Sequence, residues 1–264
     1  MDEQYLDLNR QAWDQRTESH IQSDFYGMDD FLRGKNSLKN IELELLGDIS
    51  GKDILHLQCH FGQDTLSLAR MGARTCGVDF SPRAIAYARQ LNTTLQLDAR
   101  FICCDVYSLP EHHTSLYDLV FTTYGTIGWL PNINRWARVV SHFLKPGGRL
   151  VFAEFHPLIW MLDNDLKEIR YRYFNDEAIV EEESGSYAQP DAAYTTRSMG
   201  WNHGLAEVIQ ALLDQGLELL QFREYDFSPY NVFPDCIEEE PGKFRHKHYK
   251  NRIPMTYSLL MQKK

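Results

Sequence analysis

Two aspartates stand at the ends of expected strands, where each could accept hydrogen bonds from a nucleotide. Asp79 ends the stretch "RTCGVD" and follows Gln58 by 21 residues. In dinucleotide-binding sheets a carboxylate about 20 residues beyond the first turn holds the ribose hydroxyls. Asp105 ends "FICCD" and could accept from the exocyclic amine of an adenine, while Phe80 offers an aromatic face to the ring. Either acid alone could be a simple turn former, so their order along the chain is the informative feature.

The turn at residues 58–65, "QCHFGQDT", joins the first expected strand to a helix. The N-terminus of such a helix leaves free N–H groups that can bind an anion, and Asp64 or Thr65 can cap it. A turn that holds a nucleotide usually contains several glycines, whereas this one has Gly62 alone. The pattern therefore predicts a ligand site at the strand ends and leaves open whether this turn contributes to it.

Strand and helix patterns alternate on both sides of these residues. Apolar runs predict strands, and 3.6-residue periodicity with helix-start signals such as Ser81 and Pro82 predicts helices. The expected strands are residues 53–58, 74–79, 99–105, 117–124, 149–155, 217–225 and 254–262. The expected helices are residues 4–18, 37–48, 64–71, 81–91, 132–144 and 205–216. This order predicts an α/β fold with a doubly wound, mostly parallel seven-stranded sheet and helices on both faces.

Two segments interrupt the alternation. Residues 157–200 are acidic, aromatic and glycine-containing, and we expect them to form an inserted cap of irregular strands and loops after the fifth strand. Residues 226–253 form a second segment that interrupts the alternation of strands and helices. Residues 1–48 are expected to form an N-terminal helical lid. Because no repeat or linker separates these parts, one domain over residues 1–264 is predicted.

Composition and charge argue against several classes of partner. The formal net charge is −10, which disfavours nucleic acid because the overall field repels phosphates. No stretch reaches the roughly 20 apolar residues that a membrane span needs. The charged N-terminus lacks the apolar core of a secretory signal, and five cysteines without paired spacing are typical of a reducing compartment. We therefore predict a cytoplasmic protein that binds a small-molecule substrate and neither nucleic acid nor membrane; its oligomeric state stays open.

The histidines and cysteines do not predict a metal site. His56 and His60 are four residues apart, but they lie on a strand and a turn instead of one helical face. Cys103 and Cys104 are adjacent, and neighbours on a strand point to opposite faces. No other pair has partners at the spacing of a zinc site.

Five stretches together resemble the class I S-adenosylmethionine-dependent methyltransferases, over about residues 50–156. They are "ILHLQCHFGQDT", "GVDFSPRAI", "FICCDVYSLP", "YDLVFTTYGTIGWL" and "LKPGGRLVFAE". The family's first motif usually has an acid at the place of His56 and glycines at the places of Gln58 and His60. This chain keeps Gly62 alone, and its "HLQCHFGQDT" is similar to a recurrent variant among bacterial small-molecule methyltransferases. The resemblance implies a Rossmann-like fold and S-adenosylmethionine as the cofactor.

The resemblance also implies which residues would hold the adenosine part of the cofactor. Asp79 would hold the ribose hydroxyls, and Phe80 would pack on the adenine. Asp105 would accept from the adenine amine, and the Val106 N–H would face the ring.

Other residues would lie at the methionine end, by the same resemblance. The backbone around Gln58 and Gly62 would approach the methionine moiety, and Thr65 would lie near its carboxylate. Thr122 to Tyr124 would lie beside the methionine ammonium and the transferred methyl group. The "KPGG" turn, residues 145–148, would set up the fifth strand.

Methyl transfer from a sulfonium is an in-line displacement, for which a protein supplies alignment and excludes water. A general base is needed only when the acceptor must lose a proton. The candidates near the site are Tyr124, Glu154 and His156. His156, in "EFHP", can accept a proton at neutral pH, whereas Tyr124 needs a large pKa shift. The competing interpretation is that His156 hydrogen-bonds the cap and that Tyr124 packs in the site wall.

Two alternatives to a methyltransferase stay open from the sequence. Asp79 also suits a nicotinamide-dependent oxidoreductase, although "QCHFGQ" lacks the glycine-rich pyrophosphate turn. A non-catalytic S-adenosylmethionine-binding module would explain the unusual first motif. The acidic, aromatic cap is typical of a site for a small cationic or aromatic acceptor, and O-, N- and C-methylation are not distinguished.

Overall fold

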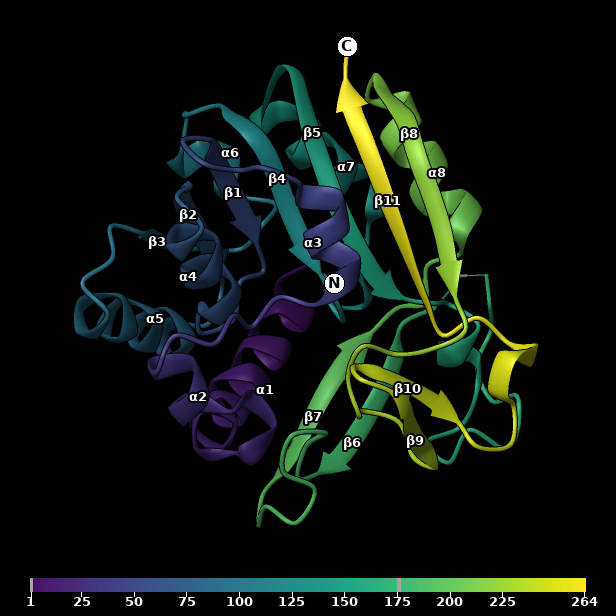
Figure 1. The fold of residues 1–264 in the computed structure, drawn as a ribbon. Helices are drawn as coiled ribbons and strands as arrows, with labels where there is room; N and C mark the ends of the chain where they lie inside the picture. Colours follow the sequence, from purple (N-terminus) through teal and green to yellow (C-terminus); the bar gives the residue numbers. More distant parts are fainter. Residues whose placement is uncertain (1, 175–176) are drawn as a thin grey trace.

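The computed structural model describes residues 2–174 and 177–264, so residue 1 of the expected lid and residues 175–176 of the expected cap lie outside the described residues. A seven-stranded sheet forms the centre, in the order β3-β2-β1-β4-β5-β11-β8 (Figure 1). Its strands are β1 (Asp53–Leu57), β2 (Arg74–Asp79), β3 (Arg100–Cys103), β4 (Tyr117–Thr123), β5 (Leu144–Phe155), β8 (Leu217–Tyr225) and β11 (Thr256–Lys263). The predicted fold class is confirmed.

The sheet is parallel from β1 to β5, and one antiparallel strand breaks the pattern. β11 lies between β5 and β8 and runs antiparallel to both. The predicted "KPGG" turn lies within β5, where Tyr117 pairs with Leu144 but Leu119 already pairs with Arg149. The extra residues form a bulge there, and Gly147 has a φ of 76°.

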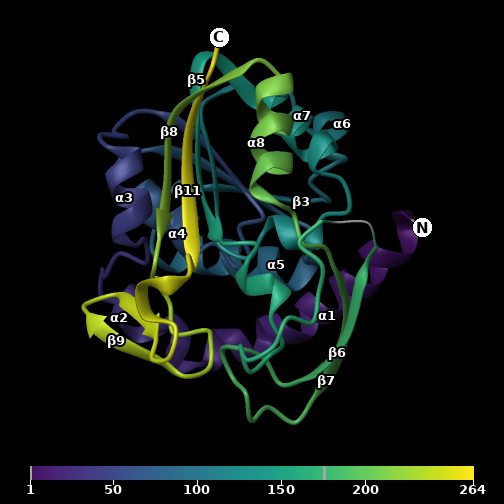
Figure 2. The same ribbon diagram turned by 90° about the vertical axis from the view of Figure 1, so that its right-hand side faces the viewer.

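Helices cover both faces of the sheet, because successive strand residues point to opposite sides. Ile54 packs under α3 (Asn40–Leu46) and α4 (Gln63–Arg70), with α5 (Pro82–Thr94) on the same face. Leu55 and Leu57 face α6 (Leu109–His112), α7 (Ile133–Phe143) and α8 (Leu205–Asp214). Figure 2 shows α3 on one side of the sheet and α7 and α8 on the other.

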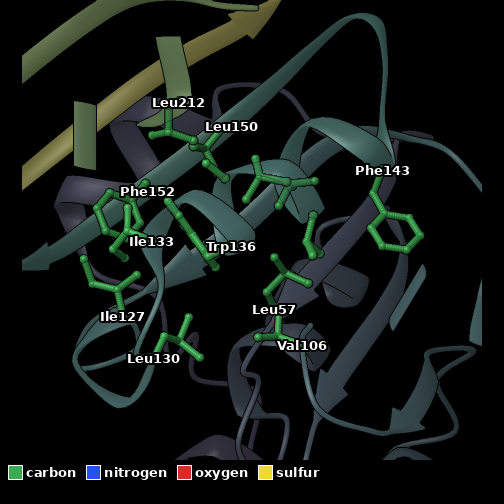
Figure 3. Close-up of a cluster of buried hydrophobic side chains, with 14 of the residues drawn as sticks. Leu57, Val106, Ile127, Leu130, Ile133, Trp136, Phe143, Leu150, Phe152 and Leu212 are labelled. Carbon is green, nitrogen blue, oxygen red and sulfur yellow. The ribbon is translucent and has the colours of Figure 1, made fainter. Parts of the chain in front are cut away.

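The largest core cluster fixes the loop that follows β4. Trp136 of α7 is fully buried and its ring lies 5.4 Å from that of Phe152 (Figure 3). Ile127 begins a short 3₁₀ helix (Ile127–Trp129) and Leu130 follows it, and both belong to the same cluster. The backbone just after β4 is therefore anchored in the core.

The remaining elements lie together beyond the carboxyl ends of the parallel strands (Figure 1). α1 (Asp2–Gln22) packs against the hairpin of β6 (Ile179–Ser184) and β7 (Thr195–Gly200). α2 (Met28–Leu32) and the hairpin of β9 (Cys236–Glu240) and β10 (Lys243–His246) lie at the same end. Short 3₁₀ helices complete the chain: Asp24–Tyr26, Ile159–Met161 and Lys250–Arg252. The predicted cap segment is therefore more regular than expected, because its second half forms a hairpin in full register.

Candidate active site

A cavity of about 680 Å³ lies at the carboxyl ends of the parallel strands. Its wall combines the turn after β1, the ends of β4 and β5, α1, the β6–β7 hairpin and the segment around Tyr230. Ligand sites of small molecules commonly have volumes of about 300 to 1,000 Å³. The position is the one at which open α/β sheets bind their ligands.

The backbone of the turn after β1 has the positive φ angles of a glycine-rich loop, although two of the three residues concerned are not glycine. Gln58 and His60 adopt positive φ angles of 56° and 51°, and Gly62 has a φ of 83°. Residues other than glycine rarely adopt positive φ angles, and those that do are concentrated at functional sites. Gly62 is required, since a Cβ there would lie 2.8 Å from a ring carbon of Phe101. The turn whose role the sequence left open therefore forms part of the cavity wall.

Gln58 presents an unused acceptor at this turn. Its Nε2 donates to the backbone carbonyl of Thr126 at 2.8 Å. Its Oε1 is buried and has no hydrogen-bond partner within the described part of the chain. Since buried polar atoms are almost always paired, this oxygen is placed to accept from a bound ligand.

Asp79 lies beside Gln58 at the end of β2. One carboxylate oxygen accepts from the His60 N–H at 2.8 Å and the other from the Ser81 N–H at 2.9 Å. Burial raises the pKa of Asp79 to about 6, although these N–H groups favour the charged form. Each oxygen keeps a free lone pair, so the carboxylate can accept further hydrogen bonds.

A second, narrower cleft of about 30 Å³ joins the ends of β2 and β3. Asp79, Phe80, Asp105 and Val106 line it together with Gln58. Residues of α1 close its outer side: Tyr5, Leu6 and Asn9. It has room for about two water molecules, so a larger ligand must displace α1.

Backbone N–H groups fix the Asp105 carboxylate in this cleft. Its carboxylate accepts from the backbone N–H groups of Tyr107 and Ser108 at 3.0 and 3.2 Å. Burial raises its pKa. The structure thus brings Asp79 and Asp105, which the sequence placed at separate strand ends, to one cleft.

Comparison with known proteins bears on the same part of the chain. Residues 54–148 match the family model for a methyltransferase domain. A demethylmenaquinone methyltransferase of Tropheryma whipplei (strain Twist) is 30% identical over 115 residues, or 43% of this chain and 46% of that protein. A ubiquinone biosynthesis O-methyltransferase of Xanthomonas oryzae pv. oryzae (strain PXO99A) is 30% identical over 108 residues, or 40% and 44%. The chain thus spans less than half the length of these curated relatives.

The likeness in fold extends further than the likeness in sequence. An S-adenosylmethionine-dependent methyltransferase structure from Mesorhizobium loti matches with a TM-score of 0.57 at 17% identity, covering 88% of this chain and all of that one. At this identity the match shows the fold alone. The match of residues 54–148 agrees with the predicted methyltransferase resemblance, because it ends within the "KPGG" turn and contains Asp79, Asp105 and Gln58.

Two residues that the resemblance placed at the methionine end of the cofactor do not reach the cavity. Thr65 is fully buried, and its hydroxyl pairs with Nδ1 of His56 at 2.8 Å. Thr122 is also fully buried and donates to the Thr126 hydroxyl at 3.3 Å. Both lie behind the wall, so the structure offers neither a direct contact with a ligand.

The expected base His156 does not line the cavity. Its neighbours Phe155 and Pro157 line the wall, and its own ring packs against Tyr257 of β11. Nε2 pairs with Glu224 of β8 at 2.9 Å, and Nδ1 accepts from the Leu158 N–H at 3.1 Å. Burial lowers its pKa, which the Glu224 carboxylate partly offsets. His156 is the first residue after β5, and its ring is held on the side of β8 and β11 by Glu224 and Tyr257.

Glu154, the third candidate, lines the cavity but its carboxylate is already occupied. It accepts from the backbone N–H groups of Gly125, Thr126 and Ile127, and from that of Phe155. Burial raises its pKa against these donors. Its role is to hold the turn after β4 in place.

Of the three candidate bases, Tyr124 is left. The sequence did not predict the residue to which its hydroxyl donates. Its hydroxyl lies in the cavity wall and donates to Oε2 of Glu42 at 2.8 Å. Glu42 is fully buried on α3. The sequence carried a signal for it, since Glu42 is four residues from both Leu38 and Leu46 and so shares their buried face.

Aromatic rings form most of the wall around Tyr124. Its ring centroid lies 5.3 Å from that of Tyr230 and 5.7 Å from that of Phe155. Phe233 continues the wall 5.1 Å from Phe155. Trp160 lies 5.7 Å beyond Phe233. This part of the cavity is shaped for a flat apolar ligand.

His60, which lines the cavity, pairs with a second histidine, His20. Nδ1 of His20 lies 3.1 Å from Nε2 of His60, and its other ring nitrogen pairs with Ser186 at 3.0 Å. Burial, together with the charge of Arg16, lowers the pKa of His20 to about 3. Both rings are therefore neutral at physiological pH.

Among the described residues no group of three His, Cys, Asp or Glu side chains could hold a metal ion. No described helix has the length and apolar character to cross a bilayer.

Proposed function

We propose that this protein is an S-adenosylmethionine-dependent methyltransferase that acts on a small molecule. The observation that carries the proposal is the cleft itself. Asp79, Asp105 and the unused Oε1 of Gln58 meet there in the part of the chain that matches a methyltransferase domain. The family names of the curated relatives, one of them an O-methyltransferase, support the same reaction class.

The residues present fit the chemistry of this cofactor. Asp79 would accept from the ribose hydroxyls, and Asp105 from the adenine amine. Phe80 and the Val106 backbone would contact the ring, and Oε1 of Gln58 would accept from the methionine ammonium. When bound, the cofactor supplies an electrophilic methyl group on a positively charged sulfur. Tyr124 and the aromatic wall would hold the acceptor, and the closed cavity would exclude water.

A nicotinamide-dependent oxidoreductase is disfavoured by the helix that follows the first turn. Its N-terminus is where a pyrophosphate would bind. In this structure Asp64 lies in the first turn of α4, lines the cavity and accepts from the Ser37 hydroxyl at 2.6 Å. A carboxylate at this place repels a phosphate. A non-catalytic module is disfavoured by the size of the cavity, which extends well beyond the adenosine cleft.

Binding calorimetry tests the proposal. We expect S-adenosylmethionine and S-adenosylhomocysteine to bind with micromolar affinity and NADH to give no heat. Asp79→Ala should weaken binding by about 1.5 to 3 kcal/mol, because a charge-assisted acceptor is lost. Asp98→Ala, on the exposed loop before β3, is the matched control and should bind normally. Tight NADH binding without S-adenosylmethionine binding would overturn the proposal.

A further inference from the structure

Glu42 caps the start of α3, but its side chain is more deeply buried than a capping residue needs to be. Its Oε1 accepts from the Lys39 N–H at 2.7 Å, as in a capping box, and its Oε2 accepts from Tyr124. The side chain is fully buried, and no ion pair to it is found among the described residues. Capping glutamates ordinarily lie at the surface, and a buried carboxylate without a cation is costly. The Tyr124 contact is therefore the feature that distinguishes Glu42.

Tyr124 is held in a strained position that faces the cavity. It follows β4 directly and has a φ of 44°, in the left-handed region that side chains avoid. The backbone on its C-terminal side is fixed by Glu154, and its own N–H donates to the Ala153 carbonyl at 2.8 Å. Such strain persists where the surrounding structure enforces it, and it is concentrated at functional sites.

We infer, on the basis of the proposed function, that Tyr124 and Glu42 form a proton-transfer pair and that the methyl acceptor is a phenolic hydroxyl. Tyr124 contacts the acceptor and is the catalytic residue. Glu42 acts through Tyr124 and is a positioning residue that stores the proton.

The step balances without a further reactant. A lone pair of the acceptor oxygen forms the new O–CH₃ bond while the S–CH₃ bond breaks and its electron pair stays on sulfur. The acceptor proton moves to Oη of Tyr124 as the Tyr124 proton moves to Oε2 of Glu42. One positive charge on sulfur and one negative charge on Glu42 disappear together, which favours the reaction in a buried site.

A phenol fits this pair better than other acceptors. The aromatic wall formed by Tyr124, Phe155 and Tyr230 suits a flat ring. A phenol carries the same kind of hydroxyl as the Tyr124 side chain, so a proton can pass from one to the other. A carbon acceptor or a neutral amine needs no such relay before the methyl moves.

The surroundings of Tyr124 and Glu42 bring the pKa of the Glu42 carboxyl close to neutrality. Burial is the main cause that raises the pKa of Glu42 to about 7, and the nearby Asp64 adds to it. Tyr225 and Tyr230 also face Tyr124, and burial raises its pKa well above the usual value. The Lys39 ammonium lies 4.5 Å from the centre of the Tyr230 ring, where it would favour a developing phenolate. Tyr124 is therefore protonated at neutral pH and passes its proton on only when Glu42 is ionised.

The test measures methyl transfer from labelled S-adenosylmethionine to three probes: 4-methylphenol, catechol and, as a matched control without an aromatic ring, cyclohexanol. We expect the phenols to be methylated and cyclohexanol not. The turnover rate should rise with pH and level off above about pH 7. Glu42→Gln keeps the capping geometry, yet should lower turnover at least a hundredfold and remove this rise. KM and S-adenosylhomocysteine affinity should stay unchanged, and Glu42→Asp should recover part of the rate.

Two further variants separate a proton relay from a packing role. Tyr124→Phe keeps the ring and should lose turnover as Glu42→Gln does. Glu44→Gln, on the exposed side of α3, should behave as the wild type. If S-adenosylmethionine binds but no phenol is methylated, the inference is overturned and the proposed function stands. If phenols are methylated and Glu42→Gln keeps the wild-type rate and pH profile, the pair is overturned alone. If the cofactor does not bind, both fail.

Discussion

At the scale of single residues, strand ends were predictable and side-chain directions were not. Asp79 and Asp105 were predicted at one site because the carboxyl ends of parallel strands share one edge, and they line one cleft. His156 follows the end of β5, and its ring pairs with Glu224 instead of lining the cavity. The Thr65 hydroxyl pairs with His56, and this pairing depends on how α4 packs on β1.

The pH dependence of cofactor binding should follow Asp79. Its pKa of about 6 means that the carboxylate is ionised above pH 6 and protonated below it. The protonated form cannot accept from both ribose hydroxyls, so the dissociation constant should rise roughly tenfold for each pH unit below 6. Calorimetry between pH 4.5 and 8 measures this. Asp79→Asn should bind weakly at every pH, and a wild-type affinity independent of pH would contradict the assignment.

Glu42 should make the folded state less stable as the pH rises. Its folded pKa of about 7 lies above the ordinary 4.5, so its contribution is full below pH 4.5 and is lost as the pH rises through 7. Glu42→Gln should therefore be more stable than the wild type at pH 8, by about 2 to 3 kcal/mol, and equal to it near pH 4.5. Urea unfolding at both pH values measures the difference. A Gln variant that is less stable at pH 8 would show that the ionised carboxylate stabilises the fold.

At the scale of elements, regular strands and helices were predicted closely, whereas the hairpins were not. Every sheet strand was expected, because buried strands have strong apolar runs, although β5 begins five residues before the predicted start at 149. The β6 and β7 segments are polar, and only two residues of β7, Thr196 and Ser198, are fully buried. Without an apolar alternation the hairpin had no sequence signal. Its order comes from pairing with itself and packing on α1.

Several α1 side chains hydrogen-bond to the hairpin: Arg16 pairs with Glu183 and Thr196, and Asn9 bonds to the backbone of β7. Nδ2 of Asn9 donates to the Met199 carbonyl and Oδ1 accepts from the Met199 N–H, both at 2.8 Å. Asn9→Ala removes both bonds, each worth about 0.5 to 1.5 kcal/mol. Because α1 closes the cleft that contains Asp79 and Asp105, where we propose that the cofactor binds, we expect S-adenosylhomocysteine to dissociate roughly tenfold faster. Stopped-flow displacement measures the rate, with exposed Gln11→Ala as the control. An unchanged rate would mean that α1 does not govern exit.

At the scale of the whole molecule, the sequence predicted the sheet but not which segments meet above it. The wall of the cavity takes residues from α1, from the segment after β5 and from the segment after β8. These segments are far apart along the chain, and no local pattern pairs them. Tyr124 and Glu42 illustrate the same limit, since 82 residues separate them.

Ligand binding should stabilise the entire fold, because the cofactor would contact several of these segments at once. At a concentration 100 times its dissociation constant, S-adenosylmethionine should add about 2.7 kcal/mol to the free energy of unfolding. For a chain of this length that corresponds to a rise in Tm of roughly 5 to 10 °C. Thermal unfolding with and without cofactor measures the shift. An equal shift with NADH would argue for the oxidoreductase instead.

The position of β11 between β5 and β8 determines how the chain can fold as it is made. β8 ends at Tyr225, but the strand that joins it to the sheet ends only at Lys263, 38 residues later. At about 5 to 20 residues per second, a ribosome needs roughly two to eight seconds to supply them. During that interval the five parallel strands can assemble and α8 can pack on α7, while β8 still lacks the strand that pairs with it. The nascent chain thus presents an unpaired strand containing Leu219, Leu220 and Phe222, and such an edge is open to pairing with another chain.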